Sequence, residues 1–270
     1  RSNLVALAPG SLVIAHEPLG LADDDARIHA ANLADGAEAR LDALDILGRG
    51  HASVSVGNAL PAFDADVFAS LYVLRRLGDD VLADRRDFRC FSHVDPATTI
   101  AKLIHDDKTV AYFSGKAEVG PRALCHRSIL ANPTKKENLE RVNKIKNREF
   151  WRPLAPVVKE EAFHDIVNAK HLSAHMLIAA EVKEEWKEKI PAVTHVDGTC
   201  RPQSVREEQN PVIHKALTLF EEMSGVPVFM NTSFNLRGEP LVDSPTDALH
   251  TFFNSDLDCL LMEDILVYRE

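Results

Sequence analysis

The chain has 270 residues, of which 45% are hydrophobic, and a formal net charge of −10 at pH 7. Its length predicts one large domain or two unequal domains with a real core. The acidic balance argues against a general nucleic-acid binder, which needs excess positive charge to displace counterions from phosphates. No apolar run approaches the ~20 residues of a membrane-spanning helix, and no signal-peptide pattern follows Arg1.

The four cysteines are widely spaced and include no Cys-x-x-Cys pair. This spacing indicates neither a zinc knuckle nor a disulfide framework, so we expect free thiols and a cytoplasmic protein. A start at Arg1, without an initiator Met, is compatible with a portion of a longer protein.

The first ninety residues reveal no function. Residues 4–14 predict a strand pair around Pro9-Gly10, residues 21–47 have helical spacing, and residues 63–77 predict an amphipathic helix that ends at Gly78. The charged stretch 79–89 is typical of a linker. We therefore divide the chain into an N-terminal segment, residues 1–90, and a domain of residues 91–270.

Asp95-Pro96 predicts the start of a helix that runs to about His105, and residues 109–113 read as a short buried strand. From residue 115 to residue 152 the chain turns basic, with ten Lys or Arg against four Glu. Arg122 and Arg127 flank a Gly-Pro turn whose backbone amides can point outward, which favours a phosphate site. A solvated basic face is the alternative.

Thr134 and Glu137 have the spacing of a capping box, which predicts a helix to about Asn147. Helical geometry turns Lys146 toward the buried arc of Val142 and Ile145. A lysine placed there must snorkel, pair with a carboxylate or meet an anionic ligand, because burying an isolated ammonium is costly. Since Arg148 and Arg152 follow closely, we favour the ligand.

The rest of the chain mixes strands and helices without regular alternation. Residues 227–230 predict a strand, Ser244-Pro245 predicts a helix start, and residues 257–262 and 265–268 predict a hairpin. Trp151 is expected in the core. His171 and His175 have the spacing of a metal pair but no third ligand nearby, so we assign no metal site.

Four paired motifs occur together in one order, and they resemble the C-terminal domain of the O-carbamoyltransferases that modify antibiotics and nodulation factors. The resemblance covers residues 95–270 and implies a YrdC-like α/β (α+β) fold, an open twisted mixed sheet with surrounding helices. The motifs are Gly120-Pro-Arg-Ala-Leu124 with Arg127-Ser-Ile-Leu130, Asn143-Lys-Ile-Lys-Asn-Arg-Glu149 with Arg152-Pro-Leu-Ala-Pro156, His195-Val-Asp-Gly198 with Arg201-Pro-Gln203, and Asn231-Thr-Ser-Phe-Asn235 with Gly238-Glu-Pro240.

The resemblance implies an enzyme that joins carbamoyl phosphate and ATP, with Mg²⁺ on the triphosphate, to give carbamoyl adenylate for transfer to a hydroxyl of a small natural product. Fixed cations suit this chemistry because two anions must meet. The implied catalytic residues are Lys146, Arg152 and Arg201, the implied phosphate-binding residues are Arg122, Arg127 and Arg148, and the implied nucleotide-binding residues are Asn231, Ser233 and Asn235.

One departure concerns the transfer step. Members of this family carry a preceding actin-like domain with a histidine pair that binds iron, and no such pair is found before Phe91. We therefore expect an actin-like domain or partner subunit, with iron only there. A threonylcarbamoyl-adenylate synthase and a diverged nucleotide-binding module without turnover stay open as alternatives.

Overall fold

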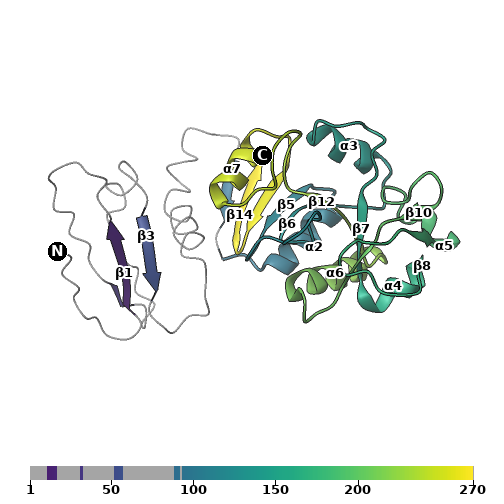
Figure 1. Ribbon diagram of the computed structural model, residues 1–270, viewed down its shortest axis with the longest axis horizontal. Coiled ribbons are helices and arrows are strands. Elements are labelled where there is room, and N and C mark those ends of the chain that lie inside the picture. Colours follow the sequence, from purple (N-terminus) through teal and green to yellow (C-terminus); the bar gives the residue numbers. More distant parts are fainter. Residues whose placement is uncertain (1–10, 17–30, 33–51, 57–87, 92, 270) are drawn as a thin grey trace. The chain divides into compact units, whose positions relative to one another are not determined.

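The computed structural model describes residues 11–16, 31–32, 52–56, 88–91 and 93–269. The chain divides into two compact units, Arg1–Val81 and Leu82–Glu270. In the first unit, β1 (Ser11–His16) pairs antiparallel with β2 (Ala31–Asn32) and β3 (Ala52–Val56) (Figure 1).

Most of what the sequence predicts for the first unit lies outside the described residues. This holds for the helix over residues 63–77, the linker at 79–87 and the strand expected before Pro9. The helical interpretation of residues 21–47 is wrong at Ala31–Asn32, because these two residues pair with β1 as a strand.

The second unit is built on one open mixed sheet of eight strands, in the order β11-β7-β12-β6-β5-β13-β14-β4. Two neighbouring pairs, β11–β7 and β13–β5, are parallel, and the other pairs are antiparallel. The predicted α/β class with a mixed sheet is therefore confirmed. In chain order the strands are β4 (Phe88–Phe91), β5 (Val110–Phe113), β6 (Arg127–Ala131), β7 (Ala155–Lys159), β11 (Gln203–Val205), β12 (Val228–Ser233), β13 (Cys259–Met262) and β14 (Ile265–Arg269).

The predicted boundary between residues 90 and 91 falls inside a strand. β4 pairs with β14 along its length, from Phe88 opposite Arg269 to Phe91 opposite Leu266. The compact units separate between Val81 and Leu82 instead. Charge and polarity around residues 79–89 masked the short strand, since only Phe88 in it is buried.

Helices surround this sheet (Figure 1). α2 (Pro96–His105) packs against α6 (Pro211–Ser224), and each begins with a proline after a residue, Asp95 or Asn210, whose side chain accepts a backbone amide. The remaining helices are α3 (Glu137–Ile145), α4 (Glu160–Ile166), α5 (Glu184–Lys187) and α7 (Pro245–Phe253). A small sheet of β10 (Thr199–Cys200), β9 (Ala180–Val182) and β8 (Val167–Asn168) completes the unit.

Local sequence signals predicted several of these elements correctly. The helix after Asp95, the strand over residues 109–113, the strand at 227–230 and the C-terminal hairpin are all present. The Ser244 start of α7 forms a complete capping box with Asp247. The four cysteines are free thiols, and among the described residues no helix is long and apolar enough to span a membrane.

The start of α3 differs from its prediction. Thr134 forms no capping box, because its hydroxyl and amide both donate to Asn132 Oδ1 at 2.8 and 2.9 Å. The helix begins at Glu137 without a side-chain cap and ends at Ile145, which makes Lys146 its C-cap. Asn132 competes for the hydroxyl and amide of Thr134, and the helix begins two residues later than the capping box predicts.

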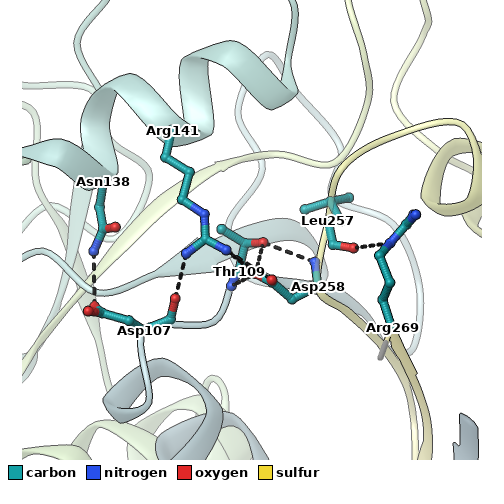
Figure 2. A network of polar contacts seen from close by, with 7 residues as sticks. All are labelled: Asp107, Thr109, Asn138, Arg141, Leu257, Asp258 and Arg269. Atoms are coloured by element: carbon teal, nitrogen blue, oxygen red, sulfur yellow. Dashed lines mark hydrogen bonds and ion pairs between the residues drawn. The ribbon is translucent and has the colours of Figure 1, made fainter. Parts of the chain in front are cut away.

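A polar network ties α3 to the sheet (Figure 2). Arg141 Nη2 donates to both carboxylate oxygens of Asp258 at 2.9 and 2.7 Å, and its Nη1 donates to Asp107 O at 2.6 Å. Asp258 also accepts from the amide and hydroxyl of Thr109 at 2.7 and 2.6 Å. Because α3 is fixed in this way, the segment that follows it, residues 146–155, has a defined position.

Candidate functional site

A cavity of about 410 Å³ lies where four motif segments meet. Its wall combines the Gly-Pro-Arg loop, the segment between α3 and β7, two loops from the middle of the chain and the end of β12. The lining residues are Pro121, Arg122, Ala123, Arg148, Arg152, Pro153, Leu154, Ala155, Met176, Ala179, His195, Arg201, Asn231, Thr232 and Ser233. The structure thus brings together Arg122, Arg148, Arg152 and Arg201, as well as Asn231 and Ser233.

The Gly-Pro-Arg loop is shaped by a carboxylate rather than by a helix. Glu118 Oε1 accepts from the amides of Leu124 and His126 at 2.6 and 2.7 Å. Gly120 has φ +132°, in the region that favours glycine. The loop therefore holds its form from within and presents Arg122 at the cavity.

Arg127 occupies a different place from Arg122. It is 2% exposed, and its guanidinium donates to the carbonyls of Ser114 and Gly115 at 2.9 Å. Its Cζ atom lies 3.5 Å from the centroid of the Phe113 ring. Arg127 does not line the cavity, and its contacts fasten the two ends of the loop, so its position favours a structural role over the expected contact with phosphate.

Lys146 is buried, as expected, with 4% of its surface exposed. Lys146 has protein partners that the sequence did not indicate, because Nζ donates to Asn235 O at 2.7 Å, Asn235 Oδ1 at 2.9 Å and Ser233 O. Burial, and next the positive charge of Arg148, lowers the pKa of Lys146 to about 7. Lys146 does not line the cavity, but its hydrogen bonds hold the loop after β12, and Ser233 of this loop lines the cavity.

Asn143 organises the two arginines that follow α3. It is fully buried, its Nδ2 donates to Phe150 O and Arg152 O at 2.9 and 2.8 Å, and its Oδ1 accepts from Arg148 Nε at 2.6 Å. The sequence motif contained Asn143, but no role was assigned to it. A polar residue on the buried face of an amphipathic helix is the signal that could have identified it.

The electrostatics of the cavity are those of an anion site. The lining contains four arginines and no carboxylate. Burial, and then Arg152, lowers the pKa of Arg148 to about 10, and burial followed by Arg122 lowers the pKa of Arg201. Because these guanidiniums remain charged at neutral pH and repel each other, a bound anion would relieve the repulsion.

The three residues predicted to bind the nucleotide have different positions relative to the cavity. Asn231 and Ser233 line the cavity, whereas Asn235 does not. Ser233 Oγ donates to Asn235 Oδ1 at 2.8 Å, and Asn235 Nδ2 donates to Glu239 O at 2.8 Å. Asn235 therefore shapes the loop, together with Lys146.

His195 joins the first cavity to a second one. The second cavity, of about 560 Å³, shares Pro153, Leu154 and His195 with the first and adds Trp151. Burial lowers the pKa of His195, so its ring is neutral at pH 7. His195 was not among the predicted site residues, although the His195-Val-Asp-Gly198 motif contained the signal.

Trp151 is 65% exposed, so the prediction that it lies in the core is wrong.

Among the described residues, no group of three or more His, Cys, Asp or Glu is arranged to hold a metal ion. The cavity therefore offers cations and neutral polar groups.

Comparison with known families gives one match over most of the second unit. The family described as Carbamoyltransferase C-terminus matches residues 101–269. The chain is 40% identical over 179 residues to the nodulation protein NolNO of Sinorhizobium fredii, covering 65% of this chain and 26% of that protein. It is 40% identical over 162 residues to the 3'-hydroxymethylcephem-O-carbamoyltransferase of Amycolatopsis lactamdurans, covering 57% of this chain and 31% of that protein.

Among solved structures, the chain is similar to Sua5 of P. abyssi in complex with L-threonine, with a TM-score of 0.45, 16% identity and coverage of 62% of this chain and 46% of that one. It is also similar to full-length HypF in a phosphate- and nucleotide-bound form, with a TM-score of 0.45, 18% identity and coverage of 68% and 22%. The chain thus spans about a quarter to a third of the length of the curated relatives named above.

Proposed function

The chain belongs to the carbamoyltransferase C-terminus family, and from that premise we propose that it forms carbamoyl adenylate from ATP and carbamoyl phosphate. The observation that carries this proposal is the cavity lined by Arg122, Arg148, Arg152 and Arg201 without a carboxylate. Two of these arginines keep a buried nitrogen, Arg148 Nη2 and Arg201 Nε, without a protein partner. Donors left in this way fit phosphate oxygens.

The proposed reaction balances with one water molecule. Water cleaves carbamoyl phosphate to carbamate and inorganic phosphate, and a carbamate oxygen then attacks the α-phosphorus of ATP. The bond from the α-phosphorus to the bridging oxygen of the β-phosphate breaks, and pyrophosphate leaves. No nucleophilic side chain is needed, because positioning and charge stabilisation carry such chemistry.

The arginines fall into two pairs that suit two anions. Arg148 and Arg152 come from one segment and repel each other. Arg201 and Arg122 come from different segments and also repel each other. We assign the first pair to carbamoyl phosphate and the second to the triphosphate, with Ser233 beside them. The lining supplies no carboxylate, so Mg²⁺ would be held mainly by phosphate oxygens, which it prefers, and would neutralise part of the triphosphate charge.

Carbamoyl adenylate is a reactive mixed anhydride, so its release into water would waste it. We propose that a further domain or a partner subunit, actin-like as the resemblance implies, transfers the carbamoyl group to a hydroxyl of a small-molecule acceptor. Any iron would belong to that part. A cytoplasmic location agrees with the free thiols.

The test is pyrophosphate release from ATP and Mg²⁺ with and without carbamoyl phosphate. We expect release that depends on carbamoyl phosphate and falls on the order of a hundredfold or more in Arg201→Met, as when one donor to developing charge is removed. Arg206→Met is the matched control, because Arg206 is exposed and pairs with Glu160 outside the cavity.

Two outcomes would contradict the proposal. ATP binding without any release would indicate a nucleotide-binding module, and release that depends on threonine and bicarbonate would indicate a threonylcarbamoyl-adenylate synthase.

A further inference from the structure

Three residues that line the cavity each have a buried side-chain atom without a hydrogen-bond partner: Arg148 Nη2, Arg201 Nε and Asn231 Oδ1. The first two are donors, whereas Asn231 Oδ1 is an acceptor. A phosphate supplies acceptors for the arginines but leaves the need of Asn231 unmet. Since an unpaired buried polar atom is costly, the ligand should also carry an N–H or O–H donor.

The orientation of the Asn231 amide is fixed by its neighbours. Asn231 is 1% exposed, and its Nδ2 donates to Gln203 Oε1 at 3.0 Å and to Ala123 O at 3.2 Å. Cys125 Sγ also lies 3.6 Å from this nitrogen, and the two oxygens are the nearer acceptors for its two hydrogens. A flipped amide would place its oxygen against two other oxygens, so Oδ1 is the atom left for a ligand.

Gln203 links the Asn231 amide to the backbone of the Gly-Pro-Arg loop. It is 4% exposed, and its Nε2 donates to Leu124 O at 3.2 Å. That bond turns Gln203 Oε1 toward Asn231 Nδ2. The Gly-Pro-Arg loop therefore sets the direction of Asn231 Oδ1 through two successive amides.

We propose that Asn231 Oδ1 accepts a hydrogen bond from the amino group of carbamoyl phosphate, and that Gln203 is the positioning residue which makes this contact selective. The inference rests on the proposed function and moves Asn231 from the nucleotide to the carbamoyl donor. Asn231 would thereby distinguish a carbamoyl group from an acyl group of the same size.

Acetyl phosphate is the informative competitor, because it replaces the amino group with a methyl group and keeps the phosphate. Bound in the same place, it would leave Asn231 Oδ1 buried and unpaired. Sites that hydrogen-bond a substrate group reject analogues that lack it. We expect the chain to bind carbamoyl phosphate more tightly than acetyl phosphate by on the order of tenfold to a hundredfold.

The experiment measures dissociation constants of carbamoyl phosphate, acetyl phosphate and ATP by calorimetry on the whole chain. Asn231→Leu removes the acceptor, and Gln203→Leu removes the group that orients it. In both variants we expect the ratio of the two acyl-phosphate constants to fall to about one. Gln203→Glu keeps an oxygen for Asn231 Nδ2 but loses the donor to Leu124 O that orients it, so the preference should also weaken in this variant. The ratio separates selectivity from folding, because partial unfolding weakens both ligands equally.

Several results would overturn the inference. Equal binding of both acyl phosphates by the unaltered chain would refute it while leaving the proposed function standing. A preference that survives Asn231→Leu would place selectivity elsewhere, and a loss of ATP affinity alone in that variant would return Asn231 to the nucleotide. Binding of neither acyl phosphate would remove the proposed function together with the inference.

Discussion

Arginines in two regions of the second unit are held in opposite ways. Arg141 makes paired contacts with the Asp258 carboxylate and a third contact with Asp107 O (Figure 2). In the cavity, Arg148 and Arg201 each keep a buried nitrogen without a protein partner, and burial, followed by a neighbouring arginine, lowers the pKa of each. An arginine whose hydrogen-bond partners all come from the chain stabilises the fold. An arginine that lacks some of these partners is available to bind a ligand.

The largest effect on stability is expected from Asp258→Ala. This change leaves the amide and hydroxyl of Thr109, which is 1% exposed, without their acceptor. We expect the free energy of unfolding of the second unit to fall by about 3 kcal/mol, measured by chemical denaturation. Asp256→Ala, on a nearby exposed position, should be nearly neutral. A loss no larger than that of the control would mean that this network adds no stability.

A smaller loss of stability is expected from Lys146→Met. Lys146 has hydrogen-bond partners in the chain, as Arg141 does, but it is also a buried cation whose pKa burial lowers, as Arg148 is. The change removes the Lys146 donor from the carbonyls of Ser233 and Asn235, although Ser233 O still accepts from Asn235 N, and it also removes a buried charge. We expect the free energy of unfolding to fall by about 2 kcal/mol and pyrophosphate release to be lost. Unchanged thermal stability would instead restore the purely ligand-binding role that the sequence predicted.

The affinity for sulfate should depend on pH through Lys146. Its pKa is lowered to about 7 in the free chain, and a nearby anion should raise it. Protonation and binding then favour each other, so affinity is highest below pH 7 and falls as the pH rises through the raised pKa of the bound state. We expect a fall of about tenfold between pH 7 and pH 9, measured by calorimetry. Sulfate keeps its charge over this pH range. A sulfate affinity that does not change with pH would therefore contradict the coupling of anion binding to the protonation of Lys146.

The smallest effect on stability is expected from Arg201→Met. Burial lowers the pKa of Arg201, which means that folding disfavours its charge. We expect the free energy of unfolding to change by less than about 0.5 kcal/mol, while sulfate affinity drops. A destabilisation as large as that of Asp258→Ala would remove the contrast between the two regions.

The sequence predicted elements best where short-range signals decide. The prolines after Asp95 and Ser244 marked helix starts correctly, since capping depends on neighbouring residues alone. It failed at Thr134, where Asn132 competed for the same hydroxyl. It also failed at β4, whose partner β14 lies far along the chain.

The candidate site was predictable in its residue types more than in its contacts. Basic residues in the motifs indicated an anion site, and four of them line one cavity. Nothing local could show that Arg127 would bind backbone carbonyls or that Lys146 would hold the loop after β12. The roles of Asn143 and Gln203 depend on partners that only the fold brings within reach.

The parallel pairing of β5 with β13 has a consequence for biosynthesis. Thr109 and Asp258, at the start of this pairing, are 149 positions apart. Until the ribosome has released β13, the four buried residues of β5 have no strand on that side. An apolar strand with an open edge invites pairing with another chain. Nascent chains stalled before residue 259 should therefore aggregate unless a chaperone protects β5.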